Sequence, residues 1–354
     1  MSKRTVCRVR QAGMRLWRLF TAKQAFARQG WGEPWKLKIW KDEIMPVVEG
    51  FVALSHAPFW DPDVVVEGAG ERFVQGVDRA RALVNDKKPD ALVVFGPDHF
   101  RNFFYDVLPS FCIGLEKLTG FGDYATPKGD MPVDQELARA IHASVIEAGF
   151  DPAFSLNMGA DHGITQPCAV FDPSRTLPVV PIMINCAGAP RPPMRRCYDF
   201  GKAVGDAIRS APGNKRVVIV GSGGLSHWVR PASADNPETT AETLEYAING
   251  RNRAVEYSAE RDAFLQERID AGISGKVNAD WDNWFLECLT SGNIEPILAL
   301  KDTEIDEVAG NGAHELRSWI AAAGAWGGSS EVFSYEPVPS WVTGMGCIGG
   351  SKPA

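Results

Sequence analysis

The sequence predicts an α/β fold in which a central mixed sheet is covered by helices. Two observations lead to this prediction. From Pro46 onward, short apolar runs rich in β-branched residues alternate with amphipathic stretches of helical length. The apolar runs stop at Gly, Pro, Asp or Ser, as buried strands commonly do. Alternating strands and helices are typical of a sheet with helices packed against its faces.

Each element can be placed along the chain. The runs expected to be buried strands are Val47–Leu54, Ala91–Phe95, Val107–Ile113, Val179–Ile184 and Arg216–Val220. The stretches expected to be helices are Glu71–Asn85, Asp134–Ala148, Pro193–Ser210, Ala254–Ile273 and Ala313–Ala323. Pro231–Thr240 is polar with two prolines, so a surface loop or lid is expected there. The last 25 residues mix aromatic residues with Pro and Gly, which indicates a tail packed against the body.

The charge is distributed unevenly, and this predicts two parts of the chain. Residues 1–44 hold 11 Lys/Arg and 3 Asp/Glu, a net charge of +8, while the remainder holds 26 basic and 41 acidic residues, a net charge of −15. We therefore expect a basic N-terminal extension over 1–44 and a single α/β domain over 45–354. Val6–Ala27 could form an amphipathic surface helix or a targeting peptide. The acidic body disfavours nucleic acid and anionic membrane as partners.

The cysteines argue against two classes of protein. The seven cysteines are odd in number and scattered, and no C-x-x-C pair occurs. Neither a disulfide framework nor a thiolate zinc site is expected. No stretch approaches the roughly 18 apolar residues of a membrane-spanning helix. A cytoplasmic protein fits these observations.

Four of the six histidines occupy similar positions relative to the predicted elements. His56, His99 and His227 each follow a predicted strand, and His162 lies in an Asp-His-Gly turn. Ligands and catalytic groups of open α/β sheets gather beyond the carboxyl ends of the strands. One such histidine alone would more often be a hydrogen-bonded loop residue, but four together predict convergence on one crevice. His142, on a predicted helix face, is not expected to belong to it.

Several histidines without cysteine indicate a metal site at the carboxyl ends of the strands. Two neutral imidazoles and one carboxylate are the usual ligands of non-haem iron(II), with positions left open for substrate and dioxygen. The same set of residue types also suits catalytic zinc. The residue types alone leave both metals open.

Several motifs resemble those of one enzyme family, the class III extradiol ring-cleaving dioxygenases. The motifs are Asp98-His99 with Asn102–Pro109, Asp161-His162-Gly163, Gly221–His227 and Trp281-Asp282-Asn283. The resemblance runs from about Val47 to Gly349, with the motifs in the expected order. Phe103–Gly114 resembles the members that cleave dihydroxyphenylpropionate more than those that cleave protocatechuate.

The resemblance implies an activity and a role for each site residue. The activity is cleavage of a substituted catechol by O2, next to its two hydroxyls, in aromatic-compound catabolism. The implied Fe2+ ligands are His56, His99 and Glu315, the last in a late helix. His227 matches the family's base, and His162 matches its acid. We expect a catechol and O2 as substrates and a homo-oligomer, and the resemblance leaves open a separate small subunit, as some members have.

Three further residues have two interpretations each. Asp98 and Asp161 lie beside site histidines and could orient an imidazole or cap the following turn. Arg101 stands where the family has a small polar residue, and it could pair with a substrate carboxylate or point to solvent. Two other functions remain as alternatives: a zinc-dependent hydrolase using the same histidines, and a non-catalytic binding protein of the same fold.

Overall fold

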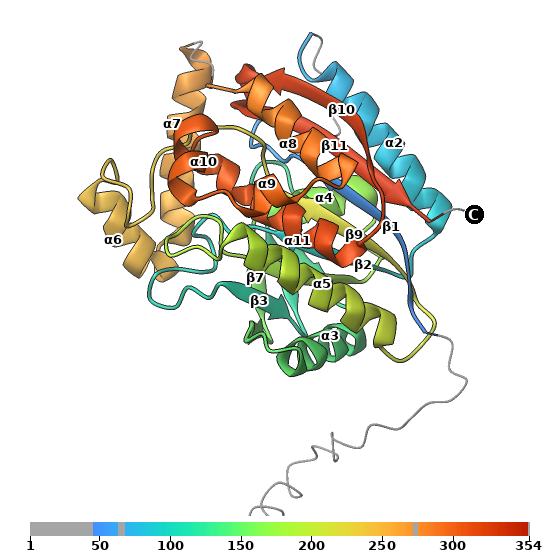
Figure 1. Cartoon of the computed structure of the whole chain (residues 1–354). Coiled ribbons are helices and arrows are strands. Elements are labelled where there is room, and N and C mark those ends of the chain that lie inside the picture. The colour runs from blue at the N-terminus through green and yellow to red at the C-terminus, as the bar shows by residue number, and fades with distance from the viewer. Residues whose placement is uncertain (1–44, 63–67, 272–274, 353–354) are drawn as a thin grey trace, which may run out of the picture. The chain divides into compact units, whose positions relative to one another are not determined.

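The computed structural model describes residues 45–62, 68–271 and 275–352, and Ile44–Ala354 form one compact unit. The strands of its central sheet are, in chain order, β1 (Val47–Leu54), β2 (Ala91–Gly96), β3 (Phe111–Gly114), β6 (Ala153–Ser155), β8 (Val179–Ile184), β9 (Arg216–Ser222), β10 (Glu331–Val338) and β11 (Thr343–Ser351). These eight strands lie in the order β10-β11-β1-β9-β2-β8-β3-β6 (Figure 1). A second sheet contains β4 (Leu118–Phe121), β5 (Lys128–Met131) and β7 (Met158–Ala160).

The central sheet is mixed, as predicted. Its middle strands β1, β9, β2 and β8 are parallel neighbours. β10 and β11 pair antiparallel, as do β11 and β1, whereas β3 pairs antiparallel with β8 and parallel with β6. Parallel strands end at the same edge of a sheet, and chemistry in open α/β folds gathers beyond that edge. The order β1-β9-β2 therefore brings together the segments that follow three strands far apart in the sequence.

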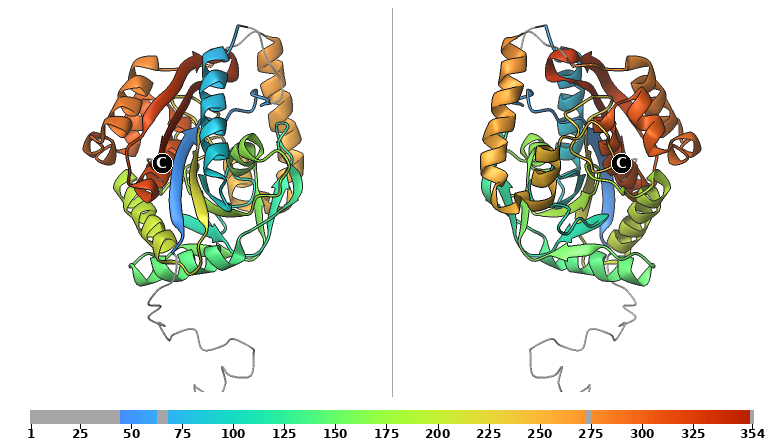
Figure 2. Two further views of the ribbon diagram at one scale, coloured as in Figure 1. Left: turned by 90° about the vertical axis from the view of Figure 1, so that its right-hand side faces the viewer. Right: turned by 90° about the vertical axis from the view of Figure 1, so that its left-hand side faces the viewer.

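Helices cover both faces of the sheet. The helices are α2 (Glu71–Lys87), α3 (Gln135–Glu147), α4 (His162–Phe171), α5 (Met194–Ser210), α6 (Ala241–Asn249), α7 (Ala254–Asp270), α8 (Ala279–Ser291), α9 (Glu295–Leu298), α10 (Asp302–Val308) and α11 (Leu316–Trp326). One core packs β2 residues Val93 and Phe95 against α3, α5, α8 and α11. The other packs Leu92 and Val94 against α2 and α4. Figure 2 shows α2 and α5 on opposite sides of β1 and β9. Burial on both faces explains why these strands are continuous apolar runs.

Most predicted elements are confirmed, and the differences have local causes. The run Val107–Ile113 forms a strand only from Phe111, because Val107 lies in a turn with 68% of its surface exposed. The late helix begins at Leu316 rather than Ala313, because Asn311–Glu315 forms a 3-10 turn. Pro231–Thr240 has no helix or strand, as expected for a loop.

The C-terminal tail is part of the central sheet. β10 and β11 form an antiparallel hairpin, and β11 pairs with β1. Glycine weakens the strand pattern of β11, but close packing requires it, since a Cβ at Gly349 would lie 2.4 Å from the Phe333 ring. No helix in the described part of the chain is long and apolar enough to cross a membrane. The predictions for residues 1–44 lie outside the described residues.

Candidate active site

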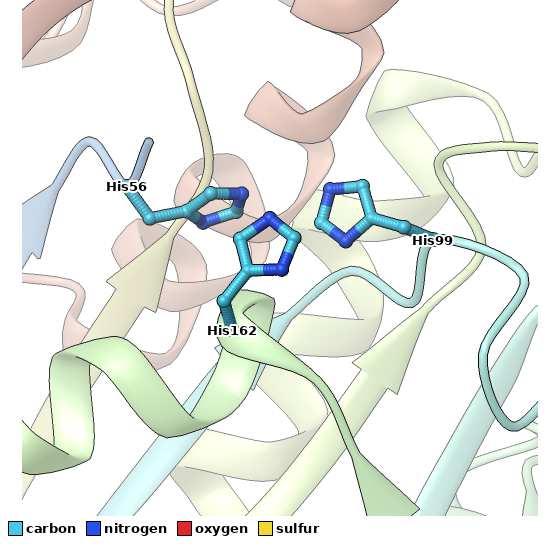
Figure 3. A group of neighbouring side chains, drawn as sticks. All are labelled: His56, His99 and His162. Atoms are coloured by element: carbon cyan, nitrogen blue, oxygen red, sulfur yellow. The ribbon is translucent and has the colours of Figure 1, made fainter. Parts of the chain in front are cut away.

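The four predicted histidines converge beyond the carboxyl ends of the parallel strands. His56 follows β1, His99 follows β2, His227 follows β9, and His162 is the first residue of α4. The ring centroid of His56 lies 5.3 Å from that of His99 and 5.0 Å from that of His162. One ring nitrogen from each of these three histidines lies within 4.8 Å of the others. Figure 3 shows the three rings gathered close together from three separate segments.

Glu315 lies among these rings. Its Oε2 is 3.2 Å from His56 Nε2, and its Oε1 is 2.9 Å from His99 Nε2 and 3.7 Å from His227 Nε2. The backbone N–H of Gly224 donates to Oε2 at 2.7 Å. Glu315 is only 6% exposed. Its carboxylate therefore contacts the imidazoles and is largely shielded from solvent.

Glycines make this close approach feasible. Gly223 has φ +150°, and a Cβ there would lie 2.9 Å from the Cβ of Glu315. A Cβ at Gly312 would lie 2.1 Å from His227 Nε2. Gly223 and Gly312 therefore leave the space that the side chains of Glu315 and His227 occupy.

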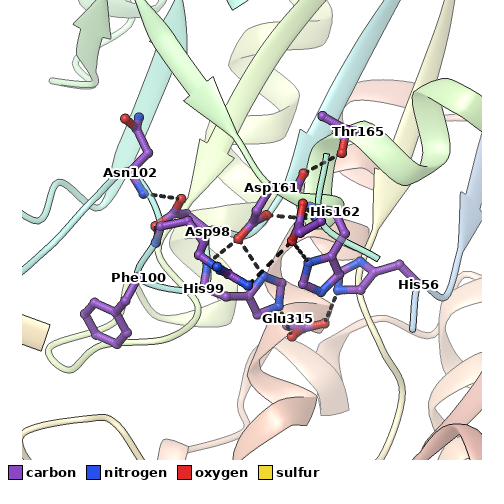
Figure 4. A network of polar contacts seen from close by, with 12 residues as sticks. His56, Asp98, His99, Phe100, Asn102, Asp161, His162, Thr165 and Glu315 are labelled. Atoms are coloured by element: carbon purple, nitrogen blue, oxygen red, sulfur yellow. Dashed lines mark hydrogen bonds and ion pairs between the residues drawn. The ribbon is translucent and has the colours of Figure 1, made fainter. Parts of the chain in front are cut away.

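The Nδ1 atoms of His56 and His99 are held by hydrogen bonds that leave their Nε2 atoms facing Glu315. His56 Nδ1 lies 2.9 Å from Ser222 Oγ, and His99 Nδ1 lies 2.9 Å from Asp161 Oδ2. Asp161 also accepts from the backbone N–H of His99 (Figure 4). Partners of this kind fix the orientation of metal-binding imidazoles.

The other two histidines are oriented in the same way. His162 Nδ1 lies 2.7 Å from Asp123 Oδ2, and His227 Nδ1 donates to the Leu225 carbonyl at 2.8 Å. His162 stacks on His99 with ring centroids 4.4 Å apart and planes at 12°. All four imidazoles thus present Nε2 to one space.

Burial and neighbouring charge set the protonation of the rings. Burial and the charge of His99 lower the pKa of His162 to about 4, so this ring is neutral at pH 7. Burial alone would lower the pKa of His227, but the nearby Glu315 carboxylate raises it above the ordinary value. Burial also opposes ionisation of Glu315, yet the surrounding rings hold its pKa well below the usual range. An anionic carboxylate among imidazoles is the charge distribution that a divalent cation requires.

Asp161 both orients an imidazole and caps the following turn, whereas Asp98 only caps the following turn. Asp161 contacts His99 and also caps α4 through the Gly163 N–H. Asp98 accepts three backbone N–H groups of the turn at 101–103. Burial and the charge of Asp161 raise the pKa of Asp98 to about 7. Asp98 therefore shapes the loop that carries His99 and forms no hydrogen bond to its ring.

The expectation that Arg101 points to solvent is wrong. Arg101 is 5% exposed, and its guanidinium lies 4.0 Å from the Asp123 carboxylate. It is not among the residues that line the cavity. Burial results from the turn that Asp98 caps, which directs the chain at Arg101 inward.

The sequence interpretation missed two polar partners. Asp123 lies in a loop after β4 with no motif around it, and only the fold brings it to His162. Ser222 belongs to the Gly-Ser-Gly-Gly motif, which was interpreted as a turn presenting His227. The motif marked Ser222 as part of the site, but nothing in the sequence indicated that Ser222 contacts His56.

A cavity of about 960 Å³ opens onto the histidines and Glu315. Aromatic side chains Phe100, Tyr246, Tyr257 and Phe264 line it, and the loop from Trp228 to Glu238 borders it. This volume accommodates a single-ring aromatic compound with a side chain. His142 lies elsewhere, 3.3 Å from the Pro152 carbonyl, as expected for a residue outside the site.

The donor atoms suit a divalent metal ion. Two ligand atoms at right angles around an ion, each about 2.1 Å away, lie about 3.0 Å apart. The Glu315 oxygens lie 3.2 Å from His56 Nε2 and 2.9 Å from His99 Nε2. Two imidazoles and one carboxylate are ligand types that both non-haem iron and catalytic zinc use.

Comparison with known proteins identifies the family. Residues 50–346 match the model of the catalytic LigB subunit of aromatic ring-opening dioxygenase. The chain is 40% identical over 320 residues to a 2,3-dihydroxyphenylpropionate/2,3-dihydroxicinnamic acid 1,2-dioxygenase of Rhodococcus sp, covering 85% of this chain and 97% of the relative. Enzymes with the same name from Rhodococcus jostii and Klebsiella pneumoniae are 38% and 34% identical, over 85% and 83% of this chain and 97% and 96% of the relatives. The chain therefore belongs to the LigB family of aromatic ring-opening dioxygenases.

Proposed function

We propose that residues 45–354 form one catalytic domain that uses iron(II) to open the ring of a catechol bearing a carboxylated side chain. The reference substrate is 2,3-dihydroxyphenylpropionate, which the relatives' names give. Both atoms of O2 enter the product, which is a ring-opened acid. Family membership favours this activity over the zinc hydrolase and the non-catalytic binding protein, which the histidines alone left open.

The observation that carries the proposal is the spacing of Glu315 from two imidazoles. His56, His99 and Glu315 would hold Fe2+, which supplies the site for catechol chelation and O2 activation. Ser222 and Asp161 orient the two imidazoles. Since metal binding would neutralise Glu315, the pKa of His227 would return toward its ordinary value.

His162 is better suited to proton transfer than to ligation. The rings of His162 and His99 stack with centroids 4.4 Å apart and planes at 12°, so their Nε2 lone pairs run side by side and do not converge on one atom. His162 would thus face the substrate. Since a metal ligand His99 would be neutral, its charge would no longer lower the pKa of His162, and His162 would carry a proton and supply it after O2 has added to the ring. Asp123 on its Nδ1 stabilises the ring when it is protonated.

His227 would act as the base. Its Nε2 lies on the Glu315 side of the cavity, and the Leu225 carbonyl accepts from its Nδ1. This hydrogen bond fixes the tautomer in which Nε2 carries a lone pair, as a base requires. His227 would remove a catechol proton, with His162 on the other side of the ring.

The environment and assembly are also part of the proposal. The six cysteines in the described part of the chain are free thiols and all are buried. Free thiols are typical of a reducing compartment, so we infer a cytoplasmic enzyme. We also infer a homo-oligomer.

The test is anaerobic reconstitution with Fe2+, followed by O2 uptake with 2,3-dihydroxyphenylpropionate. We expect one iron per chain, one O2 consumed per catechol, and a yellow ring-opened product. Loading with Zn2+ is the control and should give no O2 uptake. Hydrolysis by the zinc form together with an inactive iron form would contradict the proposal.

A further inference from the structure

Three arginines line the cavity, and they differ in how they are paired. Arg191 donates to the carbonyls of Cys186 and Ala187, and it forms ion pairs with Asp302 at 3.3 Å and Asp235 at 3.6 Å. Arg191 therefore has little capacity left for a ligand.

Among the side chains that the structure describes, the second and third arginines form no such ion pairs. Arg230 is exposed on the loop at the border of the cavity, and Arg261 is half-buried on α7. No ion pair joins Arg261 to any carboxylate whose side chain the structure describes. A guanidinium has five N–H donors, so Arg261 has donors left to present to the cavity that it lines.

The groups around Arg261 place it on the His162 side of the cavity. Its charge interacts with Tyr124 and Tyr257 and, more weakly, with Asp161 and Asp123. The Tyr124 ring packs edge-on against His162 with centroids 4.8 Å apart. Arg261 thus lies where a side chain on a bound catechol would extend past His162.

The two nearby aspartates already have partners. Asp161 accepts from the backbone and ring of His99 and from Gly163. Asp123 accepts from His162. Neither lies within 4.0 Å of the Arg261 guanidinium among the ion pairs of the described residues. The positive charge is therefore available for an incoming anion.

The surroundings suit an arylalkyl acid. Tyr246 and Tyr257 stack with centroids 3.5 Å apart beside Arg261, and Phe264 and Phe100 line the same cavity. An apolar wall ending in a cation matches a short hydrocarbon chain ending in a carboxylate. Arg and carboxylate can form two parallel N–H···O bonds, which are stronger when partly shielded from water.

We propose that Arg261 binds the side-chain carboxylate of the substrate and makes the enzyme selective for catechols with an acidic chain. The proposal rests on the function proposed above. It assigns Arg261 to substrate selection and gives it no part in ring cleavage.

The test compares two substrates with side chains of equal length, one ending in a carboxylate and the other in a methyl group. These are 3-(2,3-dihydroxyphenyl)propionate and 3-propylcatechol. For Arg261→Gln we expect kcat/KM for the acid to fall about 10- to 100-fold, mostly through KM, because a charge-assisted pair is lost. Turnover of 3-propylcatechol should change less than about twofold. Arg261→Lys should retain part of the preference, since it keeps the charge but not the planar fork.

The matched control is Arg253→Gln. Arg253 pairs with Glu256 just before α7, outside the cavity lining. The Arg253→Gln substitution removes the same charge from the same region and should leave kcat/KM for both substrates unchanged. Thermal unfolding of each variant confirms that it is folded, and Arg261→Met replaces Arg261→Gln if the latter is not.

A binding measurement separates this proposal from the proposed function. Calorimetry with 3-phenylpropionate, which lacks the hydroxyls, should show binding to metal-free wild type that weakens at least about tenfold in Arg261→Gln. The role of Arg261 would be overturned if Arg261→Gln lowered kcat/KM equally for both substrates. It would also be overturned if the wild type showed no preference for the acid. Absence of ring cleavage with intact, Arg261-dependent binding of 3-phenylpropionate would instead overturn the proposed function alone.

Discussion

Two walls enclose the cavity, and their side chains are held differently. The strand-end wall consists of His56, His99, His162, His227 and Glu315. Its side chains are at most 14% exposed, and each imidazole has a hydrogen-bond partner on Nδ1. The helical wall consists of the loop 228–240 with α6 and α7, and it includes exposed Val229 (43%) and Phe264 (40%).

The difference indicates a division of work. Reacting groups need fixed geometry, and the strand ends provide it through buried contacts. Groups that select a substrate can be changed without disturbing the chemistry when they lie on loops and surface helices. Mutations in the strand-end wall should therefore reduce kcat or metal content, and mutations in the helical wall should change KM.

The largest effect is expected from the proposed metal ligands. His56→Ala and His99→Ala should each lose bound iron, and with it O2 uptake. Metal analysis of the purified variants checks this, with His142→Ala as the control because His142 lies outside the site. Full iron content in His56→Ala would show that the three-ligand assignment is wrong.

Next in size are the two proton-transfer residues. His227→Ala should keep its iron and slow ring cleavage by about 10²- to 10⁴-fold. The loss should lessen as pH rises, because solvent then removes the catechol proton. His162→Ala should also keep its iron, but its defect comes after O2 addition and should show no comparable recovery. A pH–rate profile beside iron stoichiometry decides, and loss of iron in His227→Ala would make His227 a ligand.

A buried carboxyl behind His227 should affect stability more than chemistry. Asp282 on α8 accepts from Ser226 N–H, Ser226 Oγ and Tyr335 Oη, and burial raises its pKa to about 6. The folded state therefore holds this proton more tightly than the unfolded state, and its stabilising effect disappears as pH rises from about 4 through 6. Asp282→Asn should remove this dependence.

Urea unfolding across this pH range measures the Asp282 effect. The stability of Asp282→Asn relative to wild type should rise by roughly 3 kcal/mol between pH 4 and pH 7. A difference that is constant with pH would contradict the raised pKa.

A smaller effect is expected in the helical wall. Ser233 is 4% exposed, accepts from the Ala189 N–H and lies 3.2 Å from Tyr105 Oη, so it holds the loop in place. Ser233→Ala should raise KM several-fold, in line with the loss of about 1 kcal/mol of hydrogen bonding. Its kcat should remain near wild type. A kcat defect larger than the KM defect would contradict the separation of the two walls.

The smallest effect is expected from residues 1–44. A chain that begins at Met45 should fold, bind iron and turn over at the full-length rate, because the catalytic histidines all follow it. Circular dichroism, iron content and O2 uptake of the two forms make the comparison. A folded, iron-loaded but inactive short form would show that the extension contributes to catalysis.

Much of the fold follows from local pattern. The apolar runs that became β1, β2, β8 and β9 are buried on both faces, so they lack the alternation of half-exposed strands and stand out by composition alone. The hairpin of β10 and β11 did not stand out. Glycine does not favour strands. The glycines of β11 are needed because Phe333 of β10 and Leu225 after β9 pack closely against them.

The sequence by itself determined that histidines follow three strands, because a strand and its exit are contiguous. The tertiary structure alone decided their neighbours. Ser222 reaches His56 across 166 residues, Glu315 reaches His99 across 216, and Asp123 reaches His162 across 39. Such contacts leave no periodic trace in the sequence, since they depend on strand order and on glycines that allow close approach. Arg261 is a further example: in the sequence it is a cation on a helix surface, and only the tertiary structure makes α7 line the same cavity as the strand ends.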